Sequence, residues 1–407
     1  MAMSTCSRCQ SLILGAAWLV LATVAHAGER LVLLDGSAVQ ATVEAIDAQG
    51  AIRCQGRSEP LDLMGLRRIE RAQPPAGSQP AGGSACDVHL SSGGVLRAQN
   101  ATFDGKVFTL KWAYGDALAL PLALVRAVRL SPMPGDAPWA VPPAFEESLA
   151  QDEVKLDQLF AIVEGAVQTV RGGLQAITAS EARFIWNDAE RKLPRARVYG
   201  VVLAHRGGRP DHTGQCHIHL KDGSALWAAV RGLDGGKLAA RVGDKLDLTL
   251  PWDAVWRLDV RSTRCTFLSD LDPIEVVEEP LVTYAGPWRR DLNVLGGPLT
   301  LGKTTYEKGL GVHSRCRLSY ALDGRFDLFA ATIGLDASTG GKGACEFAVI
   351  ADGKELFRKP MRGSDPPAQV KVKITGALRL TLLVDWGDDL DLADRANWCD
   401  ARVIREK

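Results

Sequence analysis

The stretch "CHIHLKDGSALWAAVRGLDGGKLAARVGDKLDLTLPWDAVWRLDV", residues 216–260, has a counterpart earlier in the chain: "CDVHLSSGGVLRAQNATFDGKVFTLKWAYGDALALPLALVRAVRL", residues 86–130. Each opens on a cysteine and an alternating apolar segment with a histidine. Each continues through glycine turns to a Leu-Pro pair and closes on a short apolar segment. Residues 30–72 follow the same order, and residues 157–204 are a looser copy with their own Leu-Pro. This self-similarity indicates a repeated structural unit.

Each copy predicts about five short strands, with Asp35-Gly36, Asp222-Gly223 and Asp234-Gly235 as turn dipeptides. Units of this size and order suit small SH3-like or Sm-like barrels. A unit this small buries little surface alone. We therefore expect the units to pack in pairs, the first with the second and the third with the fourth.

Stretches rich in Pro, Gly and Ser at residues 73–85, 131–143 and 206–214 predict linkers. The stretch "AFEESLAQDEVKLDQLF" (144–160) has helix formers with acidic residues early, and predicts a helix. The predicted organisation of the chain is a signal peptide (1–27), two barrel repeats (28–131), a linker with a helix (132–156), two further repeats (157–262) and a final domain (266–407).

The first residues predict export. Arg8, the apolar run "SLILGAAWLVLATV" and the small-x-small "AHA" at 25–27 are typical of a cleaved signal peptide. No later segment predicts a membrane span, so we expect a secreted or periplasmic protein. Cys6 and Cys9 would leave with the signal, and the seven remaining cysteines lack metal-ligand spacing. Lys plus Arg and Asp plus Glu both number 48, and a neutral chain argues against nucleic acid as a partner.

The pattern changes after about residue 266. "CRLSYAL" (316–322), "VKVKITG" (370–376) and "LRLTLLV" (378–384) alternate apolar and polar residues, and "CEFAVIADGKELF" (345–357) predicts a hairpin that turns at Asp352-Gly353. Such alternation predicts half-buried antiparallel sheets, and two such sheets make a sandwich. The predicted fold class is therefore all-β throughout.

Five segments occur in a familiar order: "YEKGLGVHS", "LSYALDGRFDLFAATIGLD", "FAVIADGKELF", "ITGALRLTLLVDWGDD" and "DRANWCDARV". Through them, residues 267–405 resemble the NPCBM family, a carbohydrate-binding module associated with glycoside hydrolase family 98. The resemblance implies a jelly-roll β-sandwich without catalysis of its own. It also implies binding of galactose-type sugars, and a structural calcium, in some members. Family members often end "D-H-A-D-W-A-D", whereas this chain has Asp394-Arg395-Ala396-Asn397-Trp398-Cys399-Asp400.

"YEKGLGVHS" (306–314) does not predict a phosphate loop, since Ser314 stands where a third glycine is needed and an alternating strand follows. We expect Gly309 and Gly311 to let the backbone cross closely into a strand, and His313 to be packed or hydrogen-bonded. No G-x-S-x-G or H-E-x-x-H motif occurs. His217 and His219 share a strand face and are a possible metal pair, but the sequence offers no third ligand.

"DWGDDLDLADRANW" (385–398) concentrates acidic residues between two tryptophans. Three interpretations stay open: a solvated loop, a calcium site, and a sugar contact. Hard oxygen ligands close in sequence are those that calcium prefers, which makes calcium the candidate cofactor and Asp389, Asp391 and Asp394 its candidate ligands.

Sugar recognition needs an aromatic platform with planar polar groups beside it. The candidate carbohydrate-binding residues are Trp288, Arg289, Tyr306, Trp386, Asp388, Asn397 and Trp398. The predicted function is non-catalytic binding of a glycan through the C-terminal sandwich. The alternative is a scaffold whose N-terminal repeats dock protein partners, with the sandwich as a structural cap. A third hypothesis is a hydrolase whose catalytic site has no recognisable motif.

Overall fold

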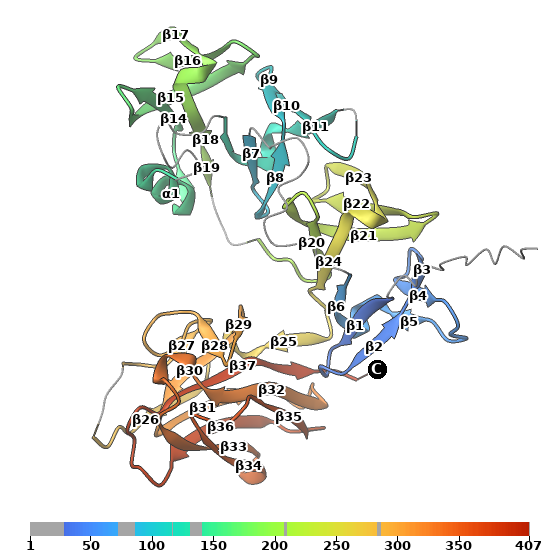
Figure 1. The fold of residues 1–407 in the computed structure, drawn as a ribbon, viewed down its shortest axis with the longest axis vertical. Coiled ribbons are helices and arrows are strands. Elements are labelled where there is room, and N and C mark those ends of the chain that lie inside the picture. Colours follow the sequence, from blue (N-terminus) through green and yellow to red (C-terminus); the bar gives the residue numbers. More distant parts are fainter. Residues whose placement is uncertain are drawn as a thin grey trace, which may run out of the picture.

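The computed structural model describes residues 28–71, 86–115, 117–130, 141–206, 210–282 and 286–406. Apart from one α-helix and short 3-10 turns, the described elements are strands in antiparallel sheets, so the predicted all-β class is confirmed (Figure 1). The predicted signal peptide, with Cys6 and Cys9, lies outside the described residues, as do the first predicted linker, most of the second, and residues 207–209 of the third.

Four consecutive units carry the N-terminal two thirds of the chain. The strands of unit 1 are β1 (Glu29–Leu33), β2 (Ala38–Ala41), β3 (Val43–Ile46), β4 (Ala51–Cys54), β5 (Leu61–Asp62) and β6 (Leu66–Glu70). Those of unit 2 are β7 (Cys86–Leu90), β8 (Gly94–Ala98), β9 (Asn100–Phe103), β10 (Val107–Lys111), β11 (Leu118–Pro121) and β12 (Val125–Arg129). Those of unit 3 are β14 (Asp157–Val163), β15 (Ala166–Ile177), β16 (Glu181–Trp186), β17 (Ala189–Pro194) and β18 (Val198–Val202). Those of unit 4 are β20 (Cys216–Leu220), β21 (Ala225–Asp234), β22 (Lys237–Val242), β23 (Leu246–Pro251) and β24 (Val255–Val260).

All four units share one pairing scheme. The first strand pairs with both the second and the last strand, as β20 does with β21 and β24, and the remaining strands follow as hairpins. In units 1 and 2 the long second strand is divided in two, which gives six strands in place of five. The scheme agrees with the repeat order in the sequence, while the closed barrel form stays a prediction.

The turns of the units also follow the sequence. Gly36, Gly223 and Gly235 have φ values of 88°, 82° and 52° between paired strands, which confirms the predicted turn dipeptides. In units 2 to 4, the Leu-Pro pair leads directly into a 3-10 turn before the last strand. Unit 1 lacks the proline, and there the side chain of Asp62 accepts a 3.0 Å hydrogen bond from the Met64 backbone N–H to cap the same turn.

The predicted pairing of the units is wrong. The last strand of unit 1, β6, pairs with the last strand of unit 4, β24, through Glu70–Arg257, Ile69–Leu258 and Arg68–Asp259. The last strand of unit 2, β12, pairs with that of unit 3, β18. Proximity along the chain favoured the first-with-second arrangement, but free strand edges pair wherever their hydrogen bonds and side chains match. Units 2 and 3 therefore form one pair and units 1 and 4 another, and a short pairing of β8 with β21 joins unit 2 to unit 4.

The predicted helix is shorter than its sequence pattern. Helix α1 spans Pro143–Ala150, and the rest of the pattern forms β13 (Glu153–Val154) and the start of β14. β13 pairs with β19 (His205–Arg206). The ring of Phe145 anchors α1, since it packs edge-on against Phe160 and Tyr199 with ring centroids 5.1 and 5.3 Å apart.

The C-terminal domain is a β-sandwich of a six-stranded and a five-stranded sheet, with a separate hairpin. The first sheet contains β25 (Cys265–Phe267), β27 (Arg289–Arg290), β30 (Gly309–His313), β32 (Leu328–Leu335), β35 (Ala368–Lys373) and β37 (Arg395–Ile404). The second contains β26 (Glu275–Glu278), β31 (Cys316–Ala321), β33 (Ala344–Ala351), β34 (Lys354–Arg362) and β36 (Arg379–Trp386). The hairpin is β28 (Leu299–Leu301) with β29 (Thr304–Tyr306). Alternating apolar residues of both sheets form one core between them, as the sequence pattern predicts.

Unit 1 contacts the sandwich directly (Figure 1). The buried guanidinium of Arg402 donates through Nε to the Leu34 carbonyl at 2.7 Å, and Arg67 pairs with Asp400 at 2.6 Å. Leu34 also packs with Ala330 and Ile404 of the sandwich. The first and last domains of the chain therefore meet in space.

Candidate functional site

The stretch 306–314 serves the fold of the sandwich. A Cβ on Gly309 would lie 2.6 Å from the Trp398 carbonyl oxygen, and one on Gly311 would lie 2.4 Å from the Leu292 carbonyl oxygen. Only glycine lets β30 pass this close to its neighbours. His313 is buried, and its Nδ1 lies 2.7 Å from the Ser314 carbonyl oxygen. The predicted tight crossing and packed histidine are both confirmed.

Two of the seven candidate sugar residues lie in the interior. The ring of Trp398 is 1% exposed and packs against Phe347 and Phe329, so neither of its faces is open to a ligand. Asn397 is fully buried, and its Nδ2 donates to Asp336 at 2.7 Å. Asp336 also accepts from Asn293, so Asn397 helps to fix the loop that covers this sheet.

Three further candidates are spread over separate parts of the sandwich. Tyr306 is half-buried against Leu299, Leu301 and Cys399, at the hairpin that packs on the first sheet. Trp288 is half-buried against the core, and the Arg290 guanidinium lies 5.3 Å from its ring centroid. Arg289 is exposed, and its Nε donates to the Val294 carbonyl at 3.1 Å.

Trp386 and Asp388 lie together at the end of β36, where a small polar surface surrounds the half-buried ring of Trp386. The Arg315 guanidinium lies 5.6 Å from the Trp386 ring centroid. Arg315 also pairs with Glu279 at 3.2 Å and with Asp385 at 3.4 Å. We call Trp386, Arg315, Glu279 and Asp385 the Trp386 surface. Asp388 is exposed beside it and pairs with Arg362 at 2.5 Å.

The Trp386 surface combines the groups that sugars need. A half-buried indole offers an apolar edge to a pyranose ring. A guanidinium and two carboxylates offer planar donors and acceptors for hydroxyl groups. Sequence reasoning missed Arg315 and Glu279, because they come from segments distant from Trp386 and only the closing of the sandwich brings them to it. Asp385 directly precedes Trp386 in the acidic stretch, but was not among the candidate residues.

The three candidate calcium ligands hold the loop after β36. Asp391 is fully buried and accepts from the backbone N–H groups of Leu281 and Val282 at 2.7 and 2.9 Å. Asp394 is fully buried and accepts from the Ser314 hydroxyl and from the Ala344 N–H. Burial raises the pKa of Asp394 to about 7, with the charges of Asp389 and Asp391 adding to the shift.

Asp389 is half-buried, and its Oδ1 has no hydrogen-bond partner among the described residues. Asp391 and Asp394 thus fasten the loop to residues 281–282, 314 and 344 without an ion. Their carboxylate chemistry fits a hard cation, and calcium at this loop stays a prediction. A bound cation would have to displace the proton that Asp394 holds at low pH.

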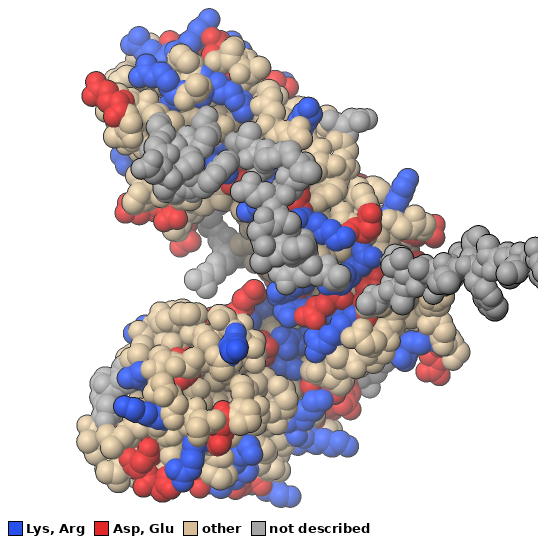
Figure 2. All heavy atoms as spheres, in the orientation of Figure 1, with Lys and Arg blue, Asp and Glu red and all other residues tan. Residues whose placement is uncertain are grey.

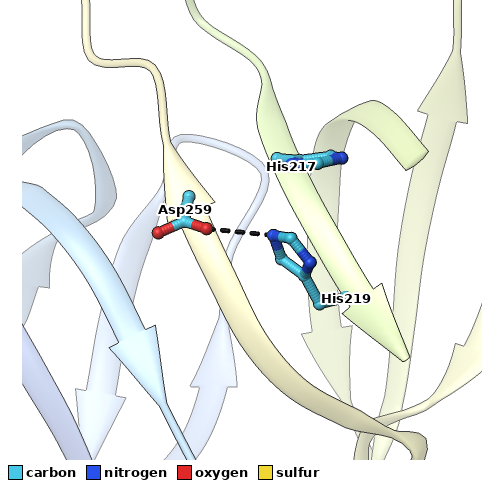
Figure 3. A group of neighbouring side chains, drawn as sticks. All are labelled: His217, His219 and Asp259. Carbon is cyan, nitrogen blue, oxygen red and sulfur yellow. Dashed lines mark hydrogen bonds and ion pairs between the residues drawn. The ribbon is translucent and has the colours of Figure 1, made fainter. Parts of the chain in front are cut away.

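A different group meets the distance requirement for a metal. In the described part of the chain, His217, His219 and Asp259 are the three metal-ligating side chains whose ligand atoms lie within 4.8 Å of one another. Figure 3 shows His219 and Asp259 pointing toward each other, 3.0 Å apart, while the ring of His217 extends away from Asp259. The ring of His217 stacks on Trp227 at 4.6 Å, and its pKa is lowered to about 4 by burial and by the neighbouring His219.

The surrounding charges argue against a metal at this group. Asp259 pairs with Arg68, and its Oδ2 lies 2.6 Å from Nε of Arg257. A divalent cation would lie beside two guanidinium groups that already balance the carboxylate. We therefore assign His219 and Asp259 to the contact between units 1 and 4, not to a metal centre.

The seven cysteines of the described residues are all free, and six of them are buried. No helix among the described residues is both long enough and apolar enough to cross a membrane.

In the comparisons with known proteins, the sandwich matches a protein-family model. Residues 264–404 match the model of the NPCBM/NEW2 domain. The C-terminal third of the chain is therefore similar to a carbohydrate-binding module, as the sequence resemblance predicts. A Renibacterium salmoninarum protein named "Putative endo-alpha-N-acetylgalactosaminidase" is 37% identical over 110 residues, which are 27% of this chain and 7% of that protein.

Two solved structures are also similar to this chain. A CBM51 module from Clostridium perfringens GH95, solved in complex with methyl-galactose, is 28% identical and covers 34% of this chain and 99% of its own, with a TM-score of 0.32. The tandem CBM51 modules of the family 98 glycoside hydrolase Sp3GH98 from Streptococcus pneumoniae SP3-BS71 are 12% identical and cover 94% of this chain and 89% of their own, with a TM-score of 0.31.

Proposed function

We propose that this is an exported, non-catalytic protein that binds a glycan through the Trp386 surface of its C-terminal sandwich. The observation that carries the proposal is the half-buried Trp386 ring with Arg315, Glu279 and Asp385 beside it, inside the region that matches the NPCBM/NEW2 model. The expected export rests on the N-terminal sequence pattern.

The chemistry of the surface favours binding over turnover. Arg315 forms ion pairs with both nearby carboxylates, so the two groups share one guanidinium. Glycoside hydrolysis usually needs two carboxyl groups that flank the scissile bond. An open surface of this kind also buries little area, so we expect weak binding per site.

The test is a glycan-array screen of the full chain, with and without calcium. We expect a glycan signal that Trp386→Ala abolishes and that Arg315→Gln weakens about tenfold, because Arg315 holds the polar groups in place. Trp386→Phe keeps an aromatic ring and should retain part of the binding. Arg379→Gln is the matched control, since Arg379 pairs with Glu275 elsewhere on the same sheet.

A silent array from the folded chain would contradict the proposal. A signal that survives Trp386→Ala would move the binding site to another surface of the chain. A calcium-dependent signal that is lost in Asp391→Asn would support the predicted calcium at the loop after β36.

One observation favours the alternative, a scaffold for protein partners. Within the described residues, β5, β11, β17 and β23 each pair with one neighbour, so every unit ends in a free strand edge. A partner segment can add to such an edge through main-chain hydrogen bonds. Pull-down with the full chain tests this function. A retained protein that is insensitive to Trp386→Ala supports it, and an empty pull-down contradicts it.

A further inference from the structure

In unit 3, the paired strands β15, β16 and β17 have an outer face that differs from the other charged surfaces of the molecule. Alternation along β15, β16 and β17 puts one set of side chains inside, as with the buried Ala182 and Phe184, and the other set outside. We call the outward set the unit 3 face: Arg171, Gly173 and Gln175 on β15, Glu181, Arg183 and Ile185 on β16, and Glu190 and Lys192 on β17.

Two cations oppose each other directly on this face. Arg183 and Lys192 are cross-strand partners in the β16–β17 ladder. Like charges in that position repel and destabilise a hairpin. Among the described residues, neither has an ion-pair partner within 4.0 Å, and the buried Nε of Arg183 has no hydrogen-bond partner. Arg171, exposed on the neighbouring strand, also lacks an ion pair in the described structure.

In the sandwich, in contrast, several exposed arginines have ion-pair partners. Arg358 there pairs with both Glu346 and Glu355, and Arg379 pairs with Glu275. The two acidic residues on the unit 3 face, Glu181 and Glu190, lie opposite Pro194 and Ile185 and form no ion pair among the described residues. The cations of the unit 3 face are therefore free to contact an outside anion. Figure 2 shows lysine and arginine atoms over the end of the molecule where Figure 1 places β15–β17.

The face also has an exposed apolar side chain beside a glycine. Ile185 is 39% exposed and lies opposite Gly173 of β15. The space where a Gly173 side chain would stand contains, within 4 Å, a single neighbouring atom, Nε2 of Gln175 at 3.7 Å. An apolar patch with an amide beside it fits the C–H face and hydroxyl groups of a sugar ring. The cations on either side fit carboxylate or sulfate groups on that ring.

We propose that the unit 3 face binds an anionic polysaccharide, a chain of sugar rings that carry carboxylates or sulfates. An anion held between Arg183 and Lys192 would relieve their mutual repulsion. The exposed Trp186 belongs to the opposite side of β16 by alternation, so the unit 3 face has no aromatic platform of the kind that single-stranded nucleic acids use. The similarity of the C-terminal third to a carbohydrate-binding module also favours a glycan over other polyanions.

The test measures binding of the full chain to immobilised dextran sulfate at two salt concentrations, with uncharged dextran as the reference polymer. We expect salt-sensitive binding to dextran sulfate alone. The double variant Arg183→Gln/Lys192→Gln should weaken it about five- to tenfold, since it removes two exposed charge contacts. Ile185→Ser should weaken it by a smaller factor, because it removes the apolar contact and keeps the charges.

The matched control is Arg231→Gln/Lys237→Gln, which removes the same two charges from exposed positions of β21 and β22 in unit 4. Trp386→Ala should leave dextran sulfate binding unchanged, which separates this site from the Trp386 surface. Equal loss in the unit 3 variant and the control variant would overturn the proposal, as would equal binding to uncharged dextran. Tighter binding of single-stranded DNA than of dextran sulfate at the same salt would assign the face to nucleic acid and overturn it too.

Discussion

Two of the contacts that join the units edge to edge have the same topology and different chemistry. In each, the last strand of one unit pairs with the last strand of another. The contact between units 2 and 3, which we call the apolar seam, pairs Val128 with Val201 and Ala127 with Val202, all fully buried. The contact between units 1 and 4, the charged seam, pairs Arg68 with Asp259 and Glu70 with Arg257 on its outward side.

The apolar seam is covered and the charged seam is open. Helix α1 places Phe145 over the apolar seam, and Gly200 lets the strands approach, since a Cβ there would lie 2.6 Å from the Val128 carbonyl oxygen. The outward charges of the other seam stay half-exposed, with side-chain exposures of 28% for Arg68 and 21% for Asp259. The difference teaches that edge pairing sets the geometry of a contact, while the covering element decides whether burial or charge stabilises it.

Phe145→Ala should have the largest effect. The substitution empties a fully enclosed aromatic site and should lower the free energy of unfolding by about 3–5 kcal/mol. Hydrogen exchange of the β12 and β18 amides should speed up, while the β6 and β24 amides keep their protection. Leu156→Ala is the matched control in the same segment, because Leu156 is 55% exposed. Equal acceleration at both seams would show that they do not open independently.

Asp259→Asn should have a smaller effect, confined to the charged seam. Removing the carboxylate leaves Arg68 and Arg257 without their shared partner, which should cost about 1–3 kcal/mol. The control Asp247→Asn removes an exposed ion pair with Arg241 in the same unit and should cost less. Urea denaturation of the three proteins at pH 7 measures both costs, and similar values for the two variants would contradict the special role of Asp259.

The effect of Asp259→Asn should depend on pH. Burial alone would raise the pKa of Asp259, but the hydrogen bond to His219 and the charges of Arg68 and Arg257 lower it below the ordinary value of 3.8. A folded-state pKa below the unfolded one stabilises the fold above that unfolded value, and the contribution is lost as the pH falls further. The difference between the native chain and Asp259→Asn should therefore be constant from pH 7 to about pH 5 and shrink below about pH 4. A constant difference down to pH 2 would contradict the assignment.

Arg30→Gln should have the smallest effect. Arg30 extends the charged seam through its 2.7 Å pair with Glu70, but 47% of its side chain is exposed. An exposed pair of this kind contributes about 0.2–1 kcal/mol, and salt screens it. Thermal unfolding of the native chain and the variant should differ slightly at low salt and coincide at 1 M NaCl. A difference that persists at 1 M NaCl would mean that Arg30 acts through packing.

The candidate site divides between what was predictable and what was not. That "DWGDDLDLADRANW" contains a loop dense in acidic side chains was predictable, because the sequence itself concentrates acidic residues between two tryptophans. The exposure of those tryptophans was not. Trp386 is the last residue of β36, at the rim of the sandwich, whereas Trp398 lies inside β37, which is covered on both faces. Alternation in the sequence indicates on which face of a strand a side chain lies. It does not indicate which element covers that face.

The sequence by itself determined the strands, their turns and the order of the four units, because alternation, turn dipeptides and the Leu-Pro before the last strand of units 2 to 4 act within a few residues. Tertiary structure alone decided that unit 1 joins unit 4 and that unit 2 joins unit 3. It also brought Arg315 to Trp386 and Arg68 to Asp259. These contacts join residues far apart in the chain, and their free energy depends on burial and charge balance that exist only once the strand edges have met.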